Sequence, residues 1–162
     1  MEINLELTTD TKTLIVYGIT YIHVIDNFSF GNIPQSTMIE NYKDGRSFSH
    51  FIEPWLAENY ANLMHVKGCK EYDYTAIDNE NIKYDQKTFT KYGCKFMPSN
   101  MIGEGRTFNK EIFEEKAKKL IYIIVSNINF PEIKVKFMRG IDLIVDYPTG
   151  TIPLKDFNKF FN

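Results

Sequence analysis

The stretch that decides the fold runs from Glu71 to Thr90 and reads Glu-Tyr-Asp-Tyr-Thr-Ala-Ile-Asp-Asn-Glu-Asn-Ile-Lys-Tyr-Asp-Gln-Lys-Thr-Phe-Thr. The character of the side chains alternates over residues 72–77 and again over residues 82–89, which is the period of a β-strand. Between them, the polar segment 78–81 is typical of a tight turn. The sequence therefore predicts a β-hairpin.

Charged residues occupy strand positions in this hairpin. Asp85 and Lys87 are two apart in the sequence, so their side chains point to the same face of the strand. If the two segments pair, Asp73 lies near Asp85. Two carboxylates and one ammonium then converge at a strand end. These groups are the minimum needed to hold a divalent cation and activate a water molecule against a phosphodiester.

Asp73 followed by Asp85-Gln86-Lys87 resembles the core motif of the PD-(D/E)XK nucleases, the restriction-endonuclease-like superfamily. Tyr72 stands where the nominal pattern has proline, a departure that this family tolerates. The resemblance implies that Asp73 and Asp85 ligate Mg²⁺, or Mn²⁺ in its place, with the carbonyl of Gln86 as a further ligand. Lys87 would orient or help to deprotonate the attacking water and stabilise the developing charge on phosphorus.

A helix is expected before the hairpin, because apolar residues recur at helical spacing: Phe51, Trp55, Leu56, Tyr60, Leu63 and Met64. Pro54 fits best if the regular helix starts near Glu53, with the proline in its first turn. Members of the superfamily often carry a glutamate on such a helix, and either Glu53 or Glu58 fills that role. The two lie on different faces, so only one can reach the site, and we favour Glu53.

Further elements are expected after the hairpin. Phe108–Leu120 is predicted to be an amphipathic helix, and Leu120–Val125 a strand buried on both faces. Glu132–Phe137 alternates strictly, and a further apolar segment, Gly140–Val145, follows. Helix, hairpin, strand, helix, strand is the order that the superfamily's core implies. We expect an α/β fold with a mixed central β-sheet flanked by helices, a restriction-endonuclease-like core with an N-terminal β extension.

The chain has 162 residues and is most simply one nuclease domain. We expect an N-terminal extension over residues 1–46, a catalytic core over 47–145 and a C-terminal tail over 146–162. In the extension, Thr13–Ile25 is predicted to be a strand, kinked at Gly18, and the segment from Asp26 to Ser36 a loop. The tail carries three phenylalanines that dock either on the domain or on a partner subunit: Phe157, Phe160 and Phe161.

The segment from Lys91 to Arg106 follows the motif strand directly and combines glycines, cations and short polar side chains. Such a loop brings backbone N–H groups and cations to phosphates, or side chains to base edges. The candidate DNA contacts are Lys91, Lys95, Ser99, Asn100 and Arg106.

The composition is that of an ordinary globular protein, with 43% hydrophobic and 25% charged residues. The net charge of −2 gives no global basic field, so any nucleic-acid contact depends on a local patch. The two cysteines form neither a disulfide framework nor a zinc-binding pattern. No apolar run approaches the ~20 residues of a membrane span, and the acidic start is unlike a signal peptide. We therefore expect a cytoplasmic protein that does not associate with membranes.

These observations favour a Mg²⁺-dependent DNA endonuclease, with a small type II restriction endonuclease as the leading interpretation. A Holliday-junction resolvase or a phage DNA-processing nuclease of the same fold is an alternative with the same chemistry. A non-catalytic interaction protein of phage or plasmid origin is an alternative of another class. For the nuclease, the expected partners are double-stranded or branched DNA and a second copy of the chain, because one site cuts one strand.

Overall fold

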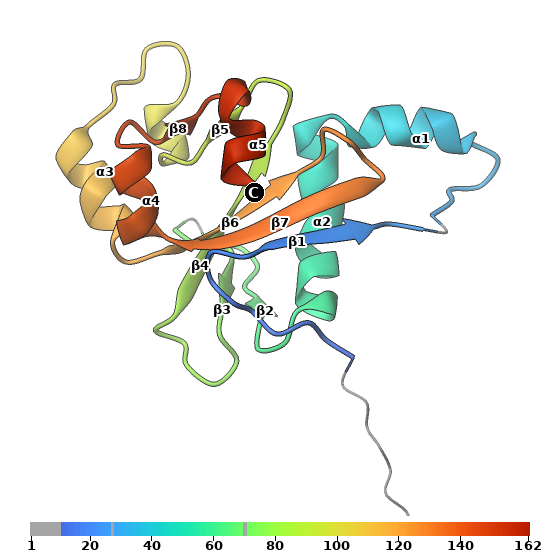
Figure 1. The fold of residues 1–162 in the computed structure, drawn as a ribbon, viewed down its shortest axis with the longest axis horizontal. Coiled ribbons are helices and arrows are strands. Elements are labelled where there is room, and N and C mark those ends of the chain that lie inside the picture. The colour runs from blue at the N-terminus through green and yellow to red at the C-terminus, as the bar shows by residue number, and fades with distance from the viewer. Residues whose placement is uncertain (1–10, 27, 70) are drawn as a thin grey trace, which may run out of the picture.

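The computed structural model describes residues 11–26, 28–69 and 71–162. Within them, six strands form one mixed sheet in the order β1, β7, β6, β4, β3, β2 (Figure 1). Their bounds are β1 Thr20–Val24, β2 Met64–His65, β3 Tyr74–Thr75, β4 Lys83–Phe89, β6 Ile121–Ser126 and β7 Glu132–Arg139. Two further strands, β5 (Cys94–Lys95) and β8 (Thr151–Ile152), pair with each other.

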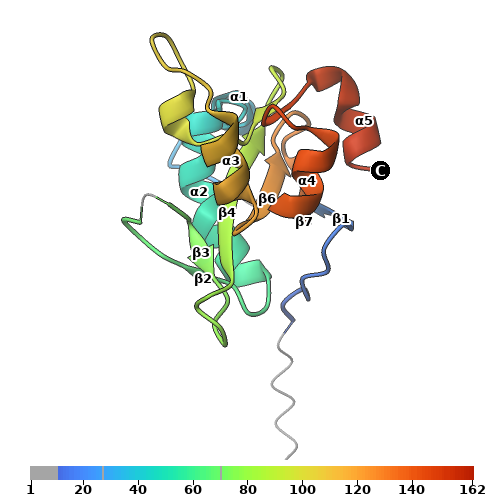
Figure 2. The same ribbon diagram turned by 90° about the vertical axis from the view of Figure 1, so that its left-hand side faces the viewer.

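Helices cover both faces of the sheet. They are α1 (Gln35–Tyr42), α2 (Gly45–Asn59), α3 (Lys110–Ala117), α4 (Gly140–Asp146) and α5 (Phe157–Phe160). Short 3₁₀ turns lie at Ser99–Met101 and Leu154–Asp156. Helix α2 packs on one face, and residues of α3, α4 and α5 join the core on the other; Figure 2 shows α2 on the opposite side of the sheet from α4 and α5. The predicted mixed sheet flanked by helices is therefore confirmed.

From α2 to β6 the elements follow one another as α2, β2, β3, β4, β5, α3, β6, and β5 alone among these strands lies outside the six-stranded sheet. Strands β2, β3 and β4 pair antiparallel, whereas β4 and β6 are parallel and joined through α3. The N-terminal segment adds the antiparallel edge strand β1 beside β7. Regular pairing there covers only Thr20–Val24, because the chain turns just before it at Gly18, whose φ is 84°.

The predicted hairpin is present. Strand β3 pairs with β4, and the Ala76 N–H donates to the Ile82 carbonyl at 3.1 Å. The Ile82 N–H in turn donates to the Asn79 carbonyl at 3.1 Å, which closes the turn. The strand β6 is buried on both faces as predicted, and β7 shows the predicted alternation of burial.

The helix before the hairpin does not start near Glu53, as predicted from Pro54. Helix α2 begins at Gly45, where the Asp44 side chain accepts hydrogen bonds from two backbone N–H groups of the first turn, and Pro54 lies inside it. The cap and a buried stripe of Phe48, Ile52 and Leu56 hold the helix together despite the proline. The predicted stripe is confirmed in part: Leu56, Tyr60 and Leu63 are buried and Trp55 packs against the core, whereas Phe51 is 61% exposed and Met64 is 46% exposed.

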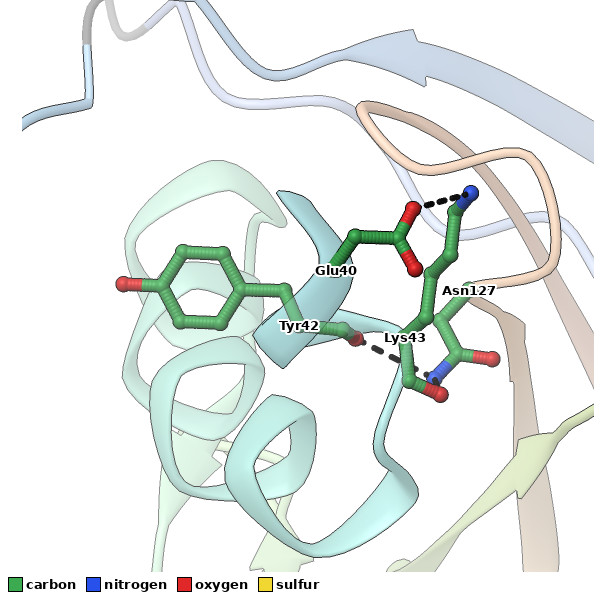
Figure 3. Close-up of polar contacts among 4 residues, drawn as sticks. All are labelled: Glu40, Tyr42, Lys43 and Asn127. Atoms are coloured by element: carbon green, nitrogen blue, oxygen red, sulfur yellow. Dashed lines mark hydrogen bonds and ion pairs between the residues drawn. The ribbon is translucent and has the colours of Figure 1, made fainter. Parts of the chain in front are cut away.

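Two helices occur where the sequence pattern predicts none, α1 and α4. The last carbonyls of α1 are satisfied from outside the helix: Nδ2 of the buried Asn127 donates to the Lys43 carbonyl at 3.0 Å and to the Tyr42 carbonyl at 3.3 Å (Figure 3). Asn127 directly follows β6, so this side chain ties the corner between α1 and α2 to the sheet. Helix α4 begins at Gly140, where a Cβ atom would lie 1.8 Å from the Ala117 carbonyl oxygen.

The three phenylalanines of the tail dock on their own domain. Phe157, Phe160 and Phe161 all pack against Phe89 of β4, with ring centroids 5.4 to 6.5 Å away. The second face of the sheet is thereby covered next to the strand that carries the motif. No helix within the described residues is both long and apolar enough to span a membrane.

Candidate active site

The hairpin register places the two motif aspartates opposite each other. Tyr74 is paired with Tyr84 and Thr75 with Lys83, so Asp73 lies across from Asp85. The Asp73 N–H donates to the Tyr84 carbonyl at 2.9 Å. The Asp73 carboxylate accepts a 2.8 Å hydrogen bond at Oδ2 from the Gln86 N–H. The proximity predicted for Asp73 and Asp85 is present.

Asp85 and Lys87 form an ion pair on one face of β4. Lys87 Nζ lies 3.2 Å from Asp85 Oδ2, and the two side chains are 20% and 17% exposed. In the parallel neighbour β6, Tyr122 is in register with Asp85 and is buried. The buried Tyr122 therefore flanks Asp85 on the β6 side, while both charged side chains keep limited access to solvent.

The environment of Asp85 disfavours its charge. Burial raises the pKa of Asp85 to about 7; Lys87 opposes this rise, and the neighbouring Asp73 carboxylate adds to it. Two carboxylates in such close proximity repel each other when both are ionised. A cation placed between them would relieve that repulsion, so the donor set suits a divalent metal.

Gln86 contributes through its backbone. Its side chain is buried on the α2 face, where Oε1 accepts a 2.6 Å hydrogen bond from the Tyr74 hydroxyl. Because the N–H and C=O of one strand residue point to the same side of the strand, the Gln86 carbonyl points toward Asp73, as its N–H does. The carbonyl is therefore on the correct side of β4 to act with Asp73 toward a cation.

Glu53 is the helix carboxylate nearest to this centre. Glu53 Oε2 lies 3.0 Å from Nε2 of His65, and the two side chains are 28% and 20% exposed. Burial raises the pKa of Glu53, the Asp73 charge raises it further, and His65 lowers it. Glu58 lies on the exposed side of α2. The fold thus brings Glu53, rather than Glu58, toward Asp73.

An open pocket of about 400 Å³ lies between α2 and the segment that begins with β2. It is lined by His50, Glu53, Pro54, His65, Val66, Lys67, Gly68, Cys69 and Asp73. Asp73 therefore belongs both to the carboxylate pair and to the wall of this pocket. A ligand in the pocket would meet Asp73 and Glu53, whereas Asp85 and Lys87 do not line it.

His65 is the site residue that the sequence pattern does not reveal. No ligand spacing connects it to His50, and its position opposite Tyr74 results only from the pairing of β2 with β3. The ring of His65 also packs against that of Tyr74, with centroids 5.4 Å apart. The sequence shows only that His65 directly follows the apolar helical pattern that ends at Met64, which does not indicate a site.

The five candidate DNA contacts are exposed: Lys91, Lys95, Ser99, Asn100 and Arg106. Lys95 alternates with the buried Cys94 on β5, so its side chain points outward. Arg106 folds back on its own loop, where Nη1 donates to the Ser99 carbonyl at 2.6 Å and to the Ile102 carbonyl at 3.2 Å. Its guanidinium therefore holds the loop together in addition to exposing charge.

Across residues 11–26, 28–69 and 71–162, no cluster of three or more His, Cys, Asp or Glu side chains has a geometry that could hold a metal ion. This finding does not conflict with a magnesium site, because Mg²⁺ keeps several waters and is commonly held by one or two carboxylates. Asp73, Asp85 and the Gln86 carbonyl provide such a partial set of oxygen donors.

Comparisons with protein-family models, with curated proteins and with solved structures give no match for this chain. The inference of function therefore depends on the geometry of the site.

Proposed function

We propose that the chain is a Mg²⁺-dependent DNA endonuclease that hydrolyses phosphodiester bonds at the centre formed by Asp73, Asp85 and Lys87. The observation that carries this proposal is the approach of Asp73 to the Asp85–Lys87 ion pair, which is 3.2 Å long and largely shielded from solvent. Two carboxylates held against their mutual repulsion lower the stability of the fold, so a purely structural role explains them poorly. The helix α2, the β3–β4 hairpin, the helix α3 and the strand β6 follow one another in the order that the PD-(D/E)XK resemblance implies, which supports the proposal, although the strand between the hairpin and α3, β5, lies outside the six-stranded sheet.

Each residue has a role that follows from its position. Asp73 and Asp85, with the Gln86 carbonyl, would hold the cation. Lys87, kept in place by Asp85, would direct the attacking water and stabilise negative charge as it develops on the phosphoryl oxygens. When bound, Mg²⁺ supplies Lewis acidity and lowers the pKa of water. The water oxygen bonds to phosphorus and the bond to the 3′ oxygen breaks, which leaves 5′-phosphate and 3′-hydroxyl ends.

The substrate proposal depends on the exposed loop that follows β4. Lys91, Lys95 and Arg106 put positive charge on a protein whose net charge is −2. Backbone phosphates are the ligands that such a local patch favours. Double-stranded or branched DNA would be cut on both strands by two copies of the chain. A restriction enzyme and a junction resolvase share this chemistry, so the substrate decides between them.

The test compares cleavage of supercoiled plasmid, phage DNA and a synthetic four-way junction by the wild type and by the variants Asp85→Asn and Lys87→Ala. The exposed Lys119→Ala, on the turn after α3, is the matched control. We expect the wild type and the control to cut in Mg²⁺, and both site variants to lose at least about 100-fold in rate. Discrete plasmid fragments would indicate a restriction enzyme, and selective cutting of the junction a resolvase.

The melting temperature supplies a readout that does not depend on finding the correct DNA. Binding of Mg²⁺ or Mn²⁺ to the folded chain raises the melting temperature by mass action. We expect such a rise in the wild type and in Lys119→Ala, and none beyond the general effect of salt in Asp85→Asn. No cleavage combined with no cation-dependent rise would favour the non-catalytic interaction protein.

A further inference from the structure

Two carboxylates, each in contact with a basic side chain, flank Asp73. On β4, Asp85 is paired with Lys87 at 3.2 Å, and between α2 and β2, Glu53 is paired with His65 at 3.0 Å. The first pair belongs to the motif from which the function is proposed, whereas the second has no role in it. Both pairs are largely shielded from solvent, with side-chain exposures between 17% and 28%.

His65 is fixed from three directions. Its backbone belongs to β2, in register with Tyr74 of β3, and its ring packs against the Tyr74 ring. The next residue, Val66, donates its N–H to the Asp73 carbonyl at 2.8 Å. The backbone next to His65 is therefore bonded directly to the backbone of Asp73, so the two residues are held near each other at the edge of the sheet.

Tyr74 links the helix that carries Glu53 to the motif strand β4. The Tyr74 hydroxyl lies 2.6 Å from Gln86 Oε1 and 3.2 Å from the Glu53 carbonyl oxygen. Glu53, His65, Tyr74 and Gln86 thus form one contact network across α2, β2, β3 and β4. Such a network holds a side chain in one orientation, which a surface ion pair does not achieve.

We propose that His65 is a positioning residue of the candidate active site: its Nε2 holds the Glu53 carboxylate in one orientation at the pocket beside Asp73, where Glu53 would accept a hydrogen bond from a water molecule bound to the cation. This inference rests on the proposed nuclease function. It makes Glu53 a third carboxylate of the site, and it explains why a histidine lies on a two-residue edge strand.

Other groups facing Glu53 do not replace His65. Asp73 opposes the charge of Glu53, whereas His50 lowers the pKa of Glu53, but His65 has the larger influence and the direct contact. Lys67 and Cys69 line the same pocket. With Nε2 as the donor, both the neutral Nε2–H tautomer and the imidazolium form of His65 satisfy the contact.

The test uses the full chain and four variants: His65→Ala, His65→Gln, Glu53→Gln, and the double variant His65→Ala with Glu53→Gln. Glutamine reaches as far as Nε2 of histidine and keeps an N–H donor for Glu53. Met64→Ala is the matched control, because Met64 is the exposed neighbour of His65 on β2. Circular dichroism of each variant reports whether it folds.

Three quantities are measured: kcat and KM for the DNA substrate, and the affinity for Mg²⁺ from the cation-dependent rise in melting temperature. We expect His65→Ala to lower kcat and the Mg²⁺ affinity about 10-fold each, with KM within about 2-fold, as for residues that orient a metal ligand. His65→Gln should recover most of both losses. In the Glu53→Gln background, His65→Ala should have no further effect.

The inference is overturned if His65→Ala behaves like Met64→Ala, or if its effect is undiminished in the Glu53→Gln background. It is also overturned if His65→Gln is as impaired as His65→Ala although both fold. Failure of the proposed function looks different: the wild type would then show neither cleavage nor a cation-dependent rise in melting temperature. If cleavage is not found but the rise is, the affinity measurements alone decide the role of His65.

Discussion

The backbone N–H of Gln86 donates a 2.8 Å hydrogen bond to Oδ2 of Asp73, thirteen residues earlier in the chain. Strand β3 begins only at Tyr74, so at this point a side chain takes the place of a backbone carbonyl as the partner of β4. The bond fixes one oxygen of Asp73. Together with the backbone hydrogen bond from the Asp73 N–H to the Tyr84 carbonyl, it holds the carboxylate beside β4, near Asp85.

The stability of the metal-free protein should fall as the pH rises from about 4 to about 7. The pKa of Asp85 is raised from 3.8 to about 7, so within this window the folded chain binds more protons than the unfolded chain. With about 1.4 kcal/mol for each unit of pKa shift, the free energy of unfolding that is lost through Asp85 as the pH rises across this window is at most about 4 kcal/mol. Urea unfolding of Asp85→Asn across this range should show a shallower decline, and identical slopes in the two proteins would contradict the expectation.

Lys87→Met should move that decline to higher pH. Lys87 lowers the pKa of Asp85, so its removal leaves burial and the Asp73 charge to raise the pKa further. Methionine keeps much of the apolar length of the lysine side chain. Urea titrations between pH 5 and pH 9 would measure the shift, with Lys119→Ala as the control. A decline at the same pH as in the wild type would show that the ion pair contributes little.

Asn62→Ala should destabilise the fold by about 2 kcal/mol. Asn62 has a φ of 62°, and its side chain exchanges two hydrogen bonds with Asp78, at 2.8 and 3.1 Å. Alanine loses both bonds and is strained at positive φ, whereas glycine loses the bonds without the strain. Asn62→Gly should therefore be about 1 kcal/mol less damaging. Chemical denaturation of both variants measures the difference, and equal losses would contradict the role of φ.

Gly140→Ala should destabilise the chain by more than about 3 kcal/mol or prevent folding. The added Cβ would lie 1.8 Å from the Ala117 carbonyl oxygen, a backbone atom that cannot move without shifting the end of α3. Gly45→Ala is the control, because its Cβ would meet only the methyl group of Thr90, at 3.3 Å. Thermal melting should separate the two variants, and a folded Gly140→Ala with a wild-type melting temperature would disprove the close contact.

Lys91→Ala and Lys95→Ala should each weaken DNA binding and its salt dependence. Each phosphate contact that is lost reduces the slope of log K against log [salt] by about 0.9. The measurement is fluorescence anisotropy with labelled DNA in Ca²⁺, which replaces Mg²⁺ to slow cleavage. Lys119→Ala should leave the slope unchanged. If all three variants lose the same slope, the loop after β4 is not the DNA-binding surface.

The sequence alone predicts those elements that depend on a pattern of neighbouring residues. The hairpin follows from alternation around a polar turn, and β6 follows from an apolar run that is buried on both faces. The proximity of Asp73, Asp85 and Lys87 was predictable for the same reason, because the register of a hairpin is set by its own turn.

The wrong and missing predictions concern tertiary contacts. Pro54 argues locally against a helix interior, yet the Asp44 cap and the packing of Phe48 and Ile52 outweigh it. Helix α1 depends on Asn127, a residue 84 positions away from the Lys43 carbonyl that it satisfies. His65 has no motif around it and gains its place only when β2 pairs with β3. Periodicity cannot show such contacts.

Strand β2 contains His65, and strand β3 begins directly after Asp73. Each of these strands has only two residues. A sheet edge with so few backbone hydrogen bonds opens locally at a lower free-energy cost than the central strands β4, β6 and β7. The amides of Val66 and Asp73 should then exchange with solvent through sub-global openings, well before those of Ile123 and Ile124. Heating would consequently open the edge that carries the candidate active site first, and the proposed activity would be lost before the core melts.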